Sequence, residues 1–322
     1  METAVICTTF NKAQQVKRNI WCMAHQDYPL DDFVLIMVDD GSADNTQEVL
    51  EESFEKFFEL NVISILTHRK PKDFFGGMGL AVNIGLRYAE ELGVEYVFLT
   101  GGDILWPTYA ISSHIKMHKD PLAISWALTG STDYNVLTDV MIGQRQYFIR
   151  PDRESLGNDS ALLASIPDRY DWKPPEKLQS QPEALTIETF TDGDYIYLGF
   201  PGDMPCDISH PTWPNLQSCK LIHWLNIGGY DEAGTGHCWE DVQLEKRLAL
   251  YAKEREENNI FPRFTTVTHP FAECYHQPHP RQLSHDNRSK LMQNIERFGY
   301  NVNKGQYLDW GRSEHIIVME RI

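Results

Sequence analysis

The chain has 322 residues, of which 42% are hydrophobic, 11% aromatic and 23% charged. These fractions lie near the averages of globular proteins, and they exclude a disordered chain, a fibre and a collagen-like repeat. Lys and Arg number 29 and Asp and Glu number 46, so the formal net charge is −17. Because such a surface repels a phosphate backbone, we expect no nucleic-acid partner.

The cysteine pattern and the hydropathy of the sequence indicate the cellular compartment in which the protein is expected. The six cysteines include no C-x-x-C pair, and a chain of this length needs no disulfide framework, so we expect a reducing, cytoplasmic location. The opening residues METAVICTTF lack the basic and apolar regions of a signal peptide. No window approaches the roughly 18 uninterrupted apolar residues of a spanning helix, so we expect no transmembrane segment. Peripheral membrane association and the oligomeric state stay open.

Apolar runs alternate with helical stripes along about the first 120 residues. Strands are predicted at 3–9, 33–38, 61–66 and 94–100. The helices between them are predicted from apolar residues three or four positions apart: Val16, Ile20 and Met23; Leu50, Phe54, Phe57 and Phe58; and Leu80, Ile84 and Tyr88, closed by Gly93. Pro107 is expected in the first turn of a further helix. This alternation predicts an α/β fold with a mainly parallel, doubly wound sheet flanked by helices.

Polar residues follow the predicted strands, where sheets of this kind bind their ligands. These residues are Thr9, Asn11, Asp39, Asp40, Ser42 and Asp103. Farther along, residues 130–220 are rich in Pro, Asp and Trp without a clear period, and we interpret them as a substrate-facing insertion. Helices are predicted from Leu244, Leu248 and Tyr251, and over 284–298 behind a Ser284 cap, so we expect a helical C-terminal tail.

Four segments, in order, resemble the motifs of the family 2 glycosyltransferases. They are AVICTTFNKAQQVKRNI, VLIMVDDGSADNT, GLAVNIGLRYAEELGVEYVFLTGGDILWP and NIGGYDEAGTGHCWEDVQLEKRL, and they extend from residue 3 to about 250. The resemblance implies a GT-A fold, a UDP-sugar or other NDP-sugar donor, a saccharide or other hydroxyl acceptor, and inversion. It also implies one continuous domain, with a nucleotide-sugar-binding half at 1–125 and an acceptor-binding half at 126–322.

The family's D-D-G motif assigns recognition of the base to Asp39, with Asp40 beside it, because a carboxylate can accept the imide N–H of uracil. Thr9 and Asn11 would line the same pocket, with Lys12 near the nucleotide. The alternatives stay open that D-D-G-S only caps a turn and the next helix, and that Lys12 is a solvated charge at a helix start.

Enzymes of this type usually hold Mg²⁺ or Mn²⁺ with a D-x-D motif, which neutralises the diphosphate leaving group. Here the D-x-D positions fall on Thr100 and Gly102, which leaves Asp103 as the carboxylate beside Gly102 in the nucleotide site. A histidine from TVTHPFAECYHQPHPRQ would complete the metal site, with His276 first and His279 second, and Arg281 could meet the diphosphate. A structural role for either histidine is the alternative.

Asp241 in the E-D motif has the role of general base in the family, and Glu240 would orient the acceptor. The alternative is that two acids at a helix start simply favour its positive end. Gly76, Gly77 and Gly79 could let the backbone approach a phosphate. Two rival functions remain: a degenerate GT-A fold that binds a sugar or nucleotide as a scaffold, and a nucleotidyltransferase, for which the expected triphosphate loop is missing.

Overall fold

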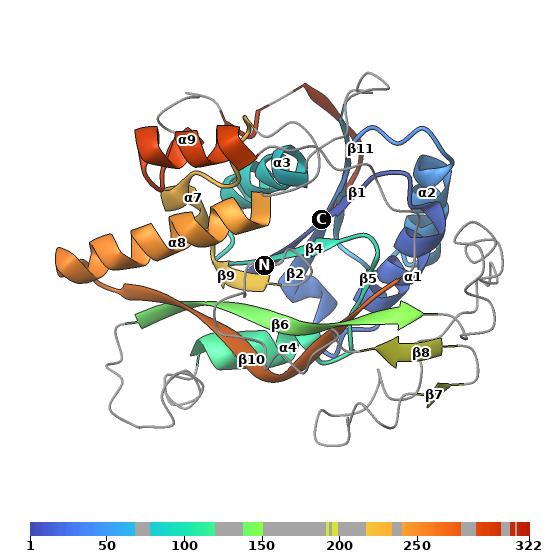
Figure 1. Ribbon diagram of the computed structural model, residues 1–322. Helices are drawn as coiled ribbons and strands as arrows, with labels where there is room; N and C mark the ends of the chain where they lie inside the picture. Colours follow the sequence, from blue (N-terminus) through green and yellow to red (C-terminus); the bar gives the residue numbers. More distant parts are fainter. Residues whose placement is uncertain are drawn as a thin grey trace.

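The chain folds around one mixed β-sheet with helices on both faces (Figure 1). The computed structural model describes residues 1–67, 78–119, 138–150, 191–192, 195–198, 217–233, 240–277, 288–303, 310–312 and 314–322. The strands are β1 (Thr3–Thr9), β2 (Phe33–Asp39), β3 (Val62–Thr67), β4 (Tyr96–Gly101), β5 (Ile104–Leu105), β6 (Thr138–Arg150), β7 (Thr191–Asp192), β8 (Tyr195–Leu198), β9 (Gln217–Lys220), β10 (Arg263–His276) and β11 (His315–Arg321).

The strand order is β11-β3-β2-β1-β4-β9-β6-β10-β5, with β8 paired to β6 and β7 to β8. Neighbours from β3 to β4 are parallel, as are β6 and β10, whereas β9 runs antiparallel to both β4 and β6. It follows that β6 and β10 run in the same direction as β4. Their carboxyl ends therefore lie at the same edge of the sheet as those of β1 and β2.

The helices are α1 (Ala13–Ala24), α2 (Thr46–Lys56), α3 (Met78–Leu92), α4 (Ala110–Lys119), α7 (Leu221–Ile227), α8 (Glu240–Glu257) and α9 (Arg288–Phe298), with a short 3₁₀ turn η1 (Leu30–Asp32). No helix within these ranges combines the length and the apolar composition needed to cross a lipid bilayer.

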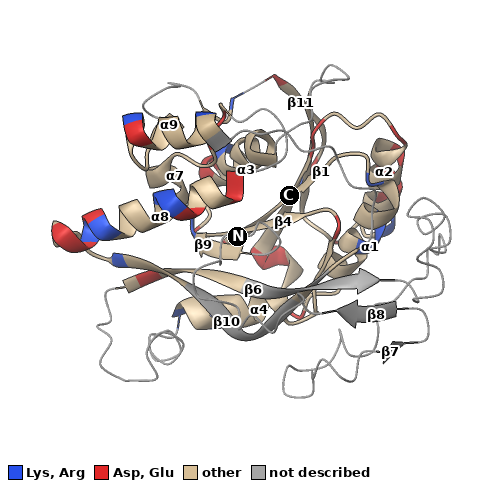
Figure 2. Ribbon diagram, viewed as in Figure 1, with Lys and Arg blue, Asp and Glu red and all other residues tan. Residues whose placement is uncertain are grey.

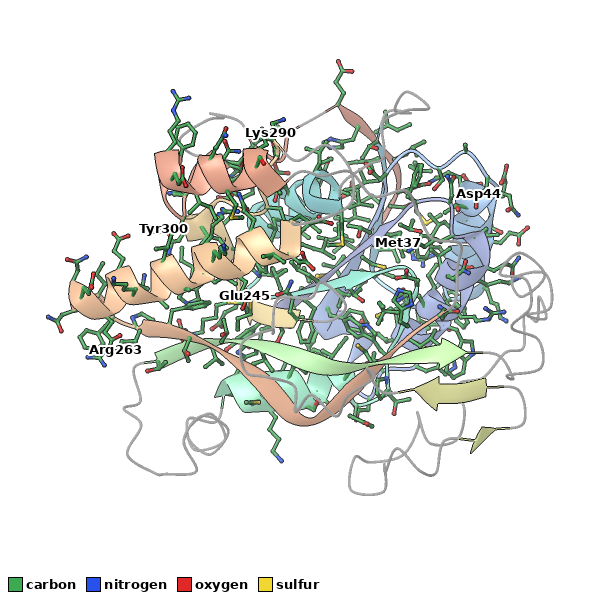
Figure 3. The ribbon with its side chains drawn as sticks, viewed as in Figure 1. Met37, Asp44, Glu245, Arg263, Lys290 and Tyr300 are labelled. Carbon is green, nitrogen blue, oxygen red and sulfur yellow. The ribbon has the colours of Figure 1, made fainter. Side chains whose placement is uncertain are left out.

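Two apolar cores lie on the two faces of the sheet, because alternate strand residues point to opposite sides. Val5 and Met37 face α1, α2 and α4, and Figure 3 shows Met37 among the side chains packed there. Ala4 and Ile6 face α3, α7 and α8. A side chain at Gly85 of α3 would collide with Ile6, so this glycine lets α3 approach β1 closely. Both faces are covered, which explains the continuous apolar runs of the first strands.

The first four predicted strands and the helices between them are confirmed. Gly93 ends α3 with a φ of 67°, a conformation that glycine adopts readily. Two details differ. Helix α2 ends at Lys56 and leaves the Phe58 side chain exposed, and Pro107 precedes α4, where its carbonyl accepts the Ala110 N–H (3.1 Å).

Two predictions for the second half are wrong. Residues 138–150 are not part of an insertion, because β6 lies inside the sheet between β9 and β10. Buried Val140, Met141 and Ile142 form too short a run to reveal a strand whose ladder partners are distant in sequence. Nor is the tail helical to its end. Helix α9 forms, but residues 315–321 pair as β11 with β3, whose outer edge offers unpaired backbone groups.

Candidate functional site

The carboxyl ends of β1, β2 and β4 are level with one another. Thr9 is in register with Asp39, and Thr8 with Gly101. The loops after these strands are also joined directly, because Asp40 N–H donates to the Thr9 carbonyl and Gly102 N–H to the Thr8 carbonyl, both at 2.8 Å. The structure therefore brings together Thr9, Asp39, Asp40 and Gly102, as the strand order predicted.

Asp39 is fully buried at the end of β2. Its carboxylate accepts hydrogen bonds from the Ser42 N–H (2.9 Å), the Ser42 hydroxyl (2.6 Å) and the Gln47 amide. Burial raises the pKa of Asp39, although these hydrogen bonds oppose the rise. Asp39 therefore stabilises the turn that follows it, as the alternative interpretation of the D-D-G-S motif expected. An ionised carboxylate accepts about four hydrogen bonds, so about one position remains for a ligand.

Asn11 fastens the loop after β1 to the loop after β2. Its φ of 52° lies in the left-handed region that Asn tolerates better than most residues. Its N–H donates to the Ser42 hydroxyl (2.7 Å), and its side-chain oxygen accepts the Ala43 N–H (2.7 Å). Asp40 turns the other way and accepts the Thr67 hydroxyl at the end of β3 (3.3 Å). Both residues therefore hold the rim of the site in shape.

The turn after β4 is closely packed. A Cβ atom at Gly102 would lie 2.7 Å from Val16 Cγ1 and 3.0 Å from Thr9 Oγ1. The Thr9 hydroxyl is itself buried and has no hydrogen-bond partner within the described residues. Thr100 is buried, and its hydroxyl accepts the Trp106 indole N–H (3.0 Å). Both D-x-D positions are thus committed to packing.

Three segments distant in sequence meet at Asp103. The Lys12 ammonium donates to Asp103 Oδ2, and His276 Nε2 lies 3.4 Å from the same oxygen. The Lys12 side chain is only 15% exposed, so it is not a solvated charge at a helix start. Strand β5 pairs with the end of β10, and the Asp103 carbonyl accepts the Gln277 N–H (2.8 Å). This pairing places His276 at the carboxyl edge of the sheet.

Polar residues on the inner face of α1 support this cluster, and the sequence analysis missed them. Arg18 donates to Gln277 (3.2 Å), Gln277 donates to the Gln15 carbonyl (3.0 Å), and Asn19 donates to the Ile104 carbonyl (2.6 Å). All of these side chains are buried. Their signal was available in the sequence, because Gln15, Arg18 and Asn19 recur at helical spacing on one face.

The described residues do not fit a divalent cation. Within the described ranges, no three His, Cys, Asp or Glu side chains are grouped so that they could hold a metal ion. Asp103 and His276 offer two donors, and the Lys12 ammonium already contacts the carboxylate. Mg²⁺ and Mn²⁺ prefer about six oxygen ligands. His279 and Arg281 lie outside the described residues.

Glu240 and Asp241 begin α8, where Asp241 Oδ1 accepts the Val242 N–H (2.7 Å). Burial first, and then the charges of Asp241 and Glu240, raise the pKa of Tyr230. The Tyr230 hydroxyl accepts the Gln217 amide (3.3 Å), and Gln217 pairs with Leu99 close to the end of β4. Figure 2 shows the acidic start of α8 turned toward the middle of the molecule.

Asn83, which belongs to the third of the four motif segments, fixes the turn at Gly229 and Tyr230, which precedes α8 in the chain. Asn83 of α3 donates to the Tyr230 carbonyl and accepts the Tyr230 N–H, both at 2.8 Å, and a side chain at Gly229 would collide with it. A Cβ at Gly79 would lie 2.8 Å from Tyr230 Cβ, so the absence of a side chain at Gly79 allows this close packing. Gly76 and Gly77 lie outside the described residues.

Comparison with known proteins finds a family model, relatives and solved structures that this chain resembles. The family model described as "Glycosyl transferase family 2" matches residues 4–164. Validoxylamine A glucosyltransferase of Streptomyces hygroscopicus subsp. jinggangensis (strain 5008) is 23% identical over 302 residues, which are 92% of this chain and 60% of that protein. Poly(ribitol-phosphate) beta-N-acetylglucosaminyltransferase TarS of Staphylococcus aureus (strain Mu50 / ATCC 700699) is 30% identical over 103 residues, 32% of this chain and 16% of TarS. The chain thus spans 60% of the length of the first relative and 16% of the second.

A solved structure of S. aureus TarS residues 1–349 in complex with UDP-GlcNAc superimposes with a TM-score of 0.54 and 15% identity, covering 92% of this chain and 65% of that one. At this identity the likeness shows the fold alone. The fold is the GT-A type that the motifs implied.

Proposed function

The chain belongs to glycosyl transferase family 2, and from that premise we propose that it moves a sugar from a UDP-sugar, or another NDP-sugar, to a hydroxyl acceptor with inversion. The meeting of Lys12, Asp103 and His276 beside the ends of β1 and β2 is the observation that carries the proposal. It supplies a partly buried, charged position at the edge where α/β sheets bind ligands. TarS, a relative with the same fold, was crystallised with UDP-GlcNAc.

In this proposal Asp39 accepts the imide N–H of the base with its remaining lone pair. Asn11 and Ser42 hold its loop in place through their mutual hydrogen bond (2.7 Å). The Thr9 hydroxyl, which has no partner among the described residues, supplies a further polar contact, because a buried hydroxyl without a partner is costly unless a ligand satisfies it. Asp40 supports the rim through Thr67.

Asp241 acts as the general base. It accepts the proton of the acceptor hydroxyl while that oxygen bonds to the anomeric carbon, and the bonding pair of the departing C–O bond stays on the diphosphate. Attack from the face opposite the diphosphate inverts the anomeric centre. Glu240 orients the acceptor. The diphosphate charge must be neutralised, and we route no step through Mg²⁺ or Mn²⁺, because the described donors do not fit one.

A binding protein without transfer activity is the second candidate, and the absence of carboxylates at Thr100 and Gly102 favours it. A panel of nucleotide sugars, scored for slow donor hydrolysis and for UDP binding, distinguishes the two. Hydrolysis of one donor supports the enzyme, whereas binding without hydrolysis or transfer supports the second candidate.

The sharpest variant is Asp241→Asn. We expect it to lose about 10²- to 10⁴-fold in hydrolysis or transfer while it still binds UDP. Glu257→Gln is a matched control, since it makes the same change of charge at the exposed far end of α8. Undiminished turnover by Asp241→Asn would remove Asp241 from the mechanism.

A further inference from the structure

We propose that the Lys12 ammonium takes the place of a divalent cation in this chain, so that nucleoside-diphosphate binding is independent of metal. This inference rests on the proposed function and names the group that meets the diphosphate. The motifs imply a metal centre, whereas the described residues place an internal cation, the Lys12 ammonium, against Asp103.

The first step is that the motif positions cannot regain carboxylates without repacking. At Gly102, even a methyl group would press on Val16, which is fully buried, and on Thr9. At Thr100 the side chain is buried and bonded to Trp106 (3.0 Å). Asp103 is therefore the carboxylate left at this turn.

The second step is that Lys12 is fixed where a cation is needed. Its N–H donates to the Thr46 hydroxyl (3.1 Å), and its carbonyl accepts the Val16 N–H (2.9 Å) as α1 begins. Thr46 is held in turn by Asp44 through its own N–H (3.0 Å). With its backbone anchored on both sides, Lys12 reaches Asp103 with a side chain that is 15% exposed.

The third step concerns charge. A divalent ion at Asp103 Oδ2 would have to displace the ammonium, because two cations that share one oxygen repel strongly in a partly buried site. The ammonium carries three N–H donors, so it can bond Asp103 and a phosphate oxygen together. Asp103 then positions Lys12, and His276 Nε2 lies 3.4 Å from the same oxygen. Lysine binds phosphates in this manner as a point charge.

The chain contains a matched control. At the amino edge, Lys220 Nζ lies 2.9 Å from Asp139 Oδ1, and His223 Nε2 lies 2.8 Å from Asp139 Oδ2. This second set has the same residue types, but it lies at the opposite edge of the sheet, where Lys220 pairs with the start of β4. Lys220→Ala therefore removes an equivalent lysine away from the proposed site.

The test is calorimetry of UDP, and separately of GDP, with the full chain in EDTA and in Mn²⁺. For the unmodified chain we expect the Kd of the better nucleotide to differ by less than about threefold between the two conditions. In EDTA, Lys12→Ala should weaken binding at least about tenfold, and Lys12→Arg and Lys220→Ala much less. Asp103→Asn should keep its affinity in EDTA within about fivefold, because the ammonium remains.

Binding that appears only with Mn²⁺, or Lys12→Ala binding as tightly as the unmodified chain in EDTA, overturns this inference and leaves the proposed function standing. Loss of binding by Asp103→Asn also overturns it, and that result stays informative if Lys12→Ala fails to fold. If neither nucleotide binds in either condition, this inference fails, and the proposed function fails as well for UDP-sugar and GDP-sugar donors.

Discussion

Two clusters of Asp, Lys and His lie at opposite edges of the same sheet. At the carboxyl edge, Lys12 and His276 contact Asp103; at the amino edge, Lys220 and His223 contact Asp139. Each cluster contains one Lys–Asp pair and one His–Asp pair, so the residue types do not distinguish the two clusters. What differs is how deeply each histidine is buried and where the strands end.

The amino-edge histidine is fully engaged inside the protein. His223 is 1% exposed, bonds Asp139 through Nε2 (2.8 Å) and the Tyr251 hydroxyl through Nδ1 (2.9 Å), and packs on Phe264. The carboxyl-edge histidine is 19% exposed and lies 3.4 Å from its aspartate. The burial of the first cluster indicates a role in stability, and we propose that the second cluster meets a ligand. On this proposal the strand edge, and not the residue types, distinguishes the two roles.

The largest stability effect should come from His223→Ala. It removes a buried ring and takes one hydrogen bond each from Asp139 and the Tyr251 hydroxyl, so we expect a loss of about 2–4 kcal/mol in the free energy of unfolding. Denaturant unfolding measures it. His276→Ala is the matched control and should lose less than about 1 kcal/mol. Equal losses would erase the distinction between the clusters.

Gly102→Ala tests the packing of the turn at the carboxyl edge. The added methyl would lie 2.7 Å from Val16 Cγ1, and we expect a cost of about 1–3 kcal/mol together with weaker UDP binding, because Asp103 follows directly. Thermal unfolding and calorimetry measure the two effects. An unchanged melting temperature would show that the turn can yield, and it would weaken the case against a second carboxylate there.

The pH dependence of stability should follow His223. Burial lowers the pKa of His223 below its usual 6.5, although Asp139 opposes this. The unfolded chain therefore binds a proton that the folded chain does not. The contribution of His223 is complete above about pH 6.5 and is lost as the pH falls, with a slope of at most about 1.4 kcal/mol per pH unit.

Unfolding by denaturant between pH 8 and pH 5 measures this slope, and His223→Gln should flatten the curve. Asp139 acts in a lower window. Burial raises its pKa, but the hydrogen bonds from His223 and Lys220 outweigh burial and leave the pKa lowered from 3.8. Its contribution therefore persists above that value and is lost only in stronger acid. A curve of unchanged slope in His223→Gln would assign the loss to another group.

The smallest effect should be that of Lys220→Ala. Its side chain is 32% exposed, so loss of its ion pair with Asp139 should cost about 0.2–1 kcal/mol. UDP affinity should not change. A clear loss of UDP affinity in this variant would connect the amino edge to the site and contradict the separation of roles.

The sequence could predict the parallel half of the sheet and the rim of the site. Strands such as β1 and β2 are buried on both faces, so they read as continuous apolar runs, and the polar residues after them must share an edge once the strands are parallel. Thr9, Asp39 and Asp40 were found in this way. The GT-A fold came from the motifs.

The rest depends on contacts that no local pattern encodes. Lys12 and Asp103 are 91 positions apart, and Asn83 holds Tyr230 across 147. Strand β6 is defined by its pairing with β9 and β10, and β11 by the open edge of β3. Roles for Asp241, Glu240, His276 and Asp103 in chemistry stay predictions, as do those of His279 and Arg281.

A crystal structure of the chain with UDP, grown in EDTA, tests the central claim most directly. We predict the uracil imide at hydrogen-bonding distance from the Asp39 carboxylate and a phosphate oxygen at hydrogen-bonding distance from Lys12 Nζ, with Asp241 facing the same space. UDP bound away from the ends of β1, β2 and β4, or diphosphate oxygens that avoid Lys12, would contradict it.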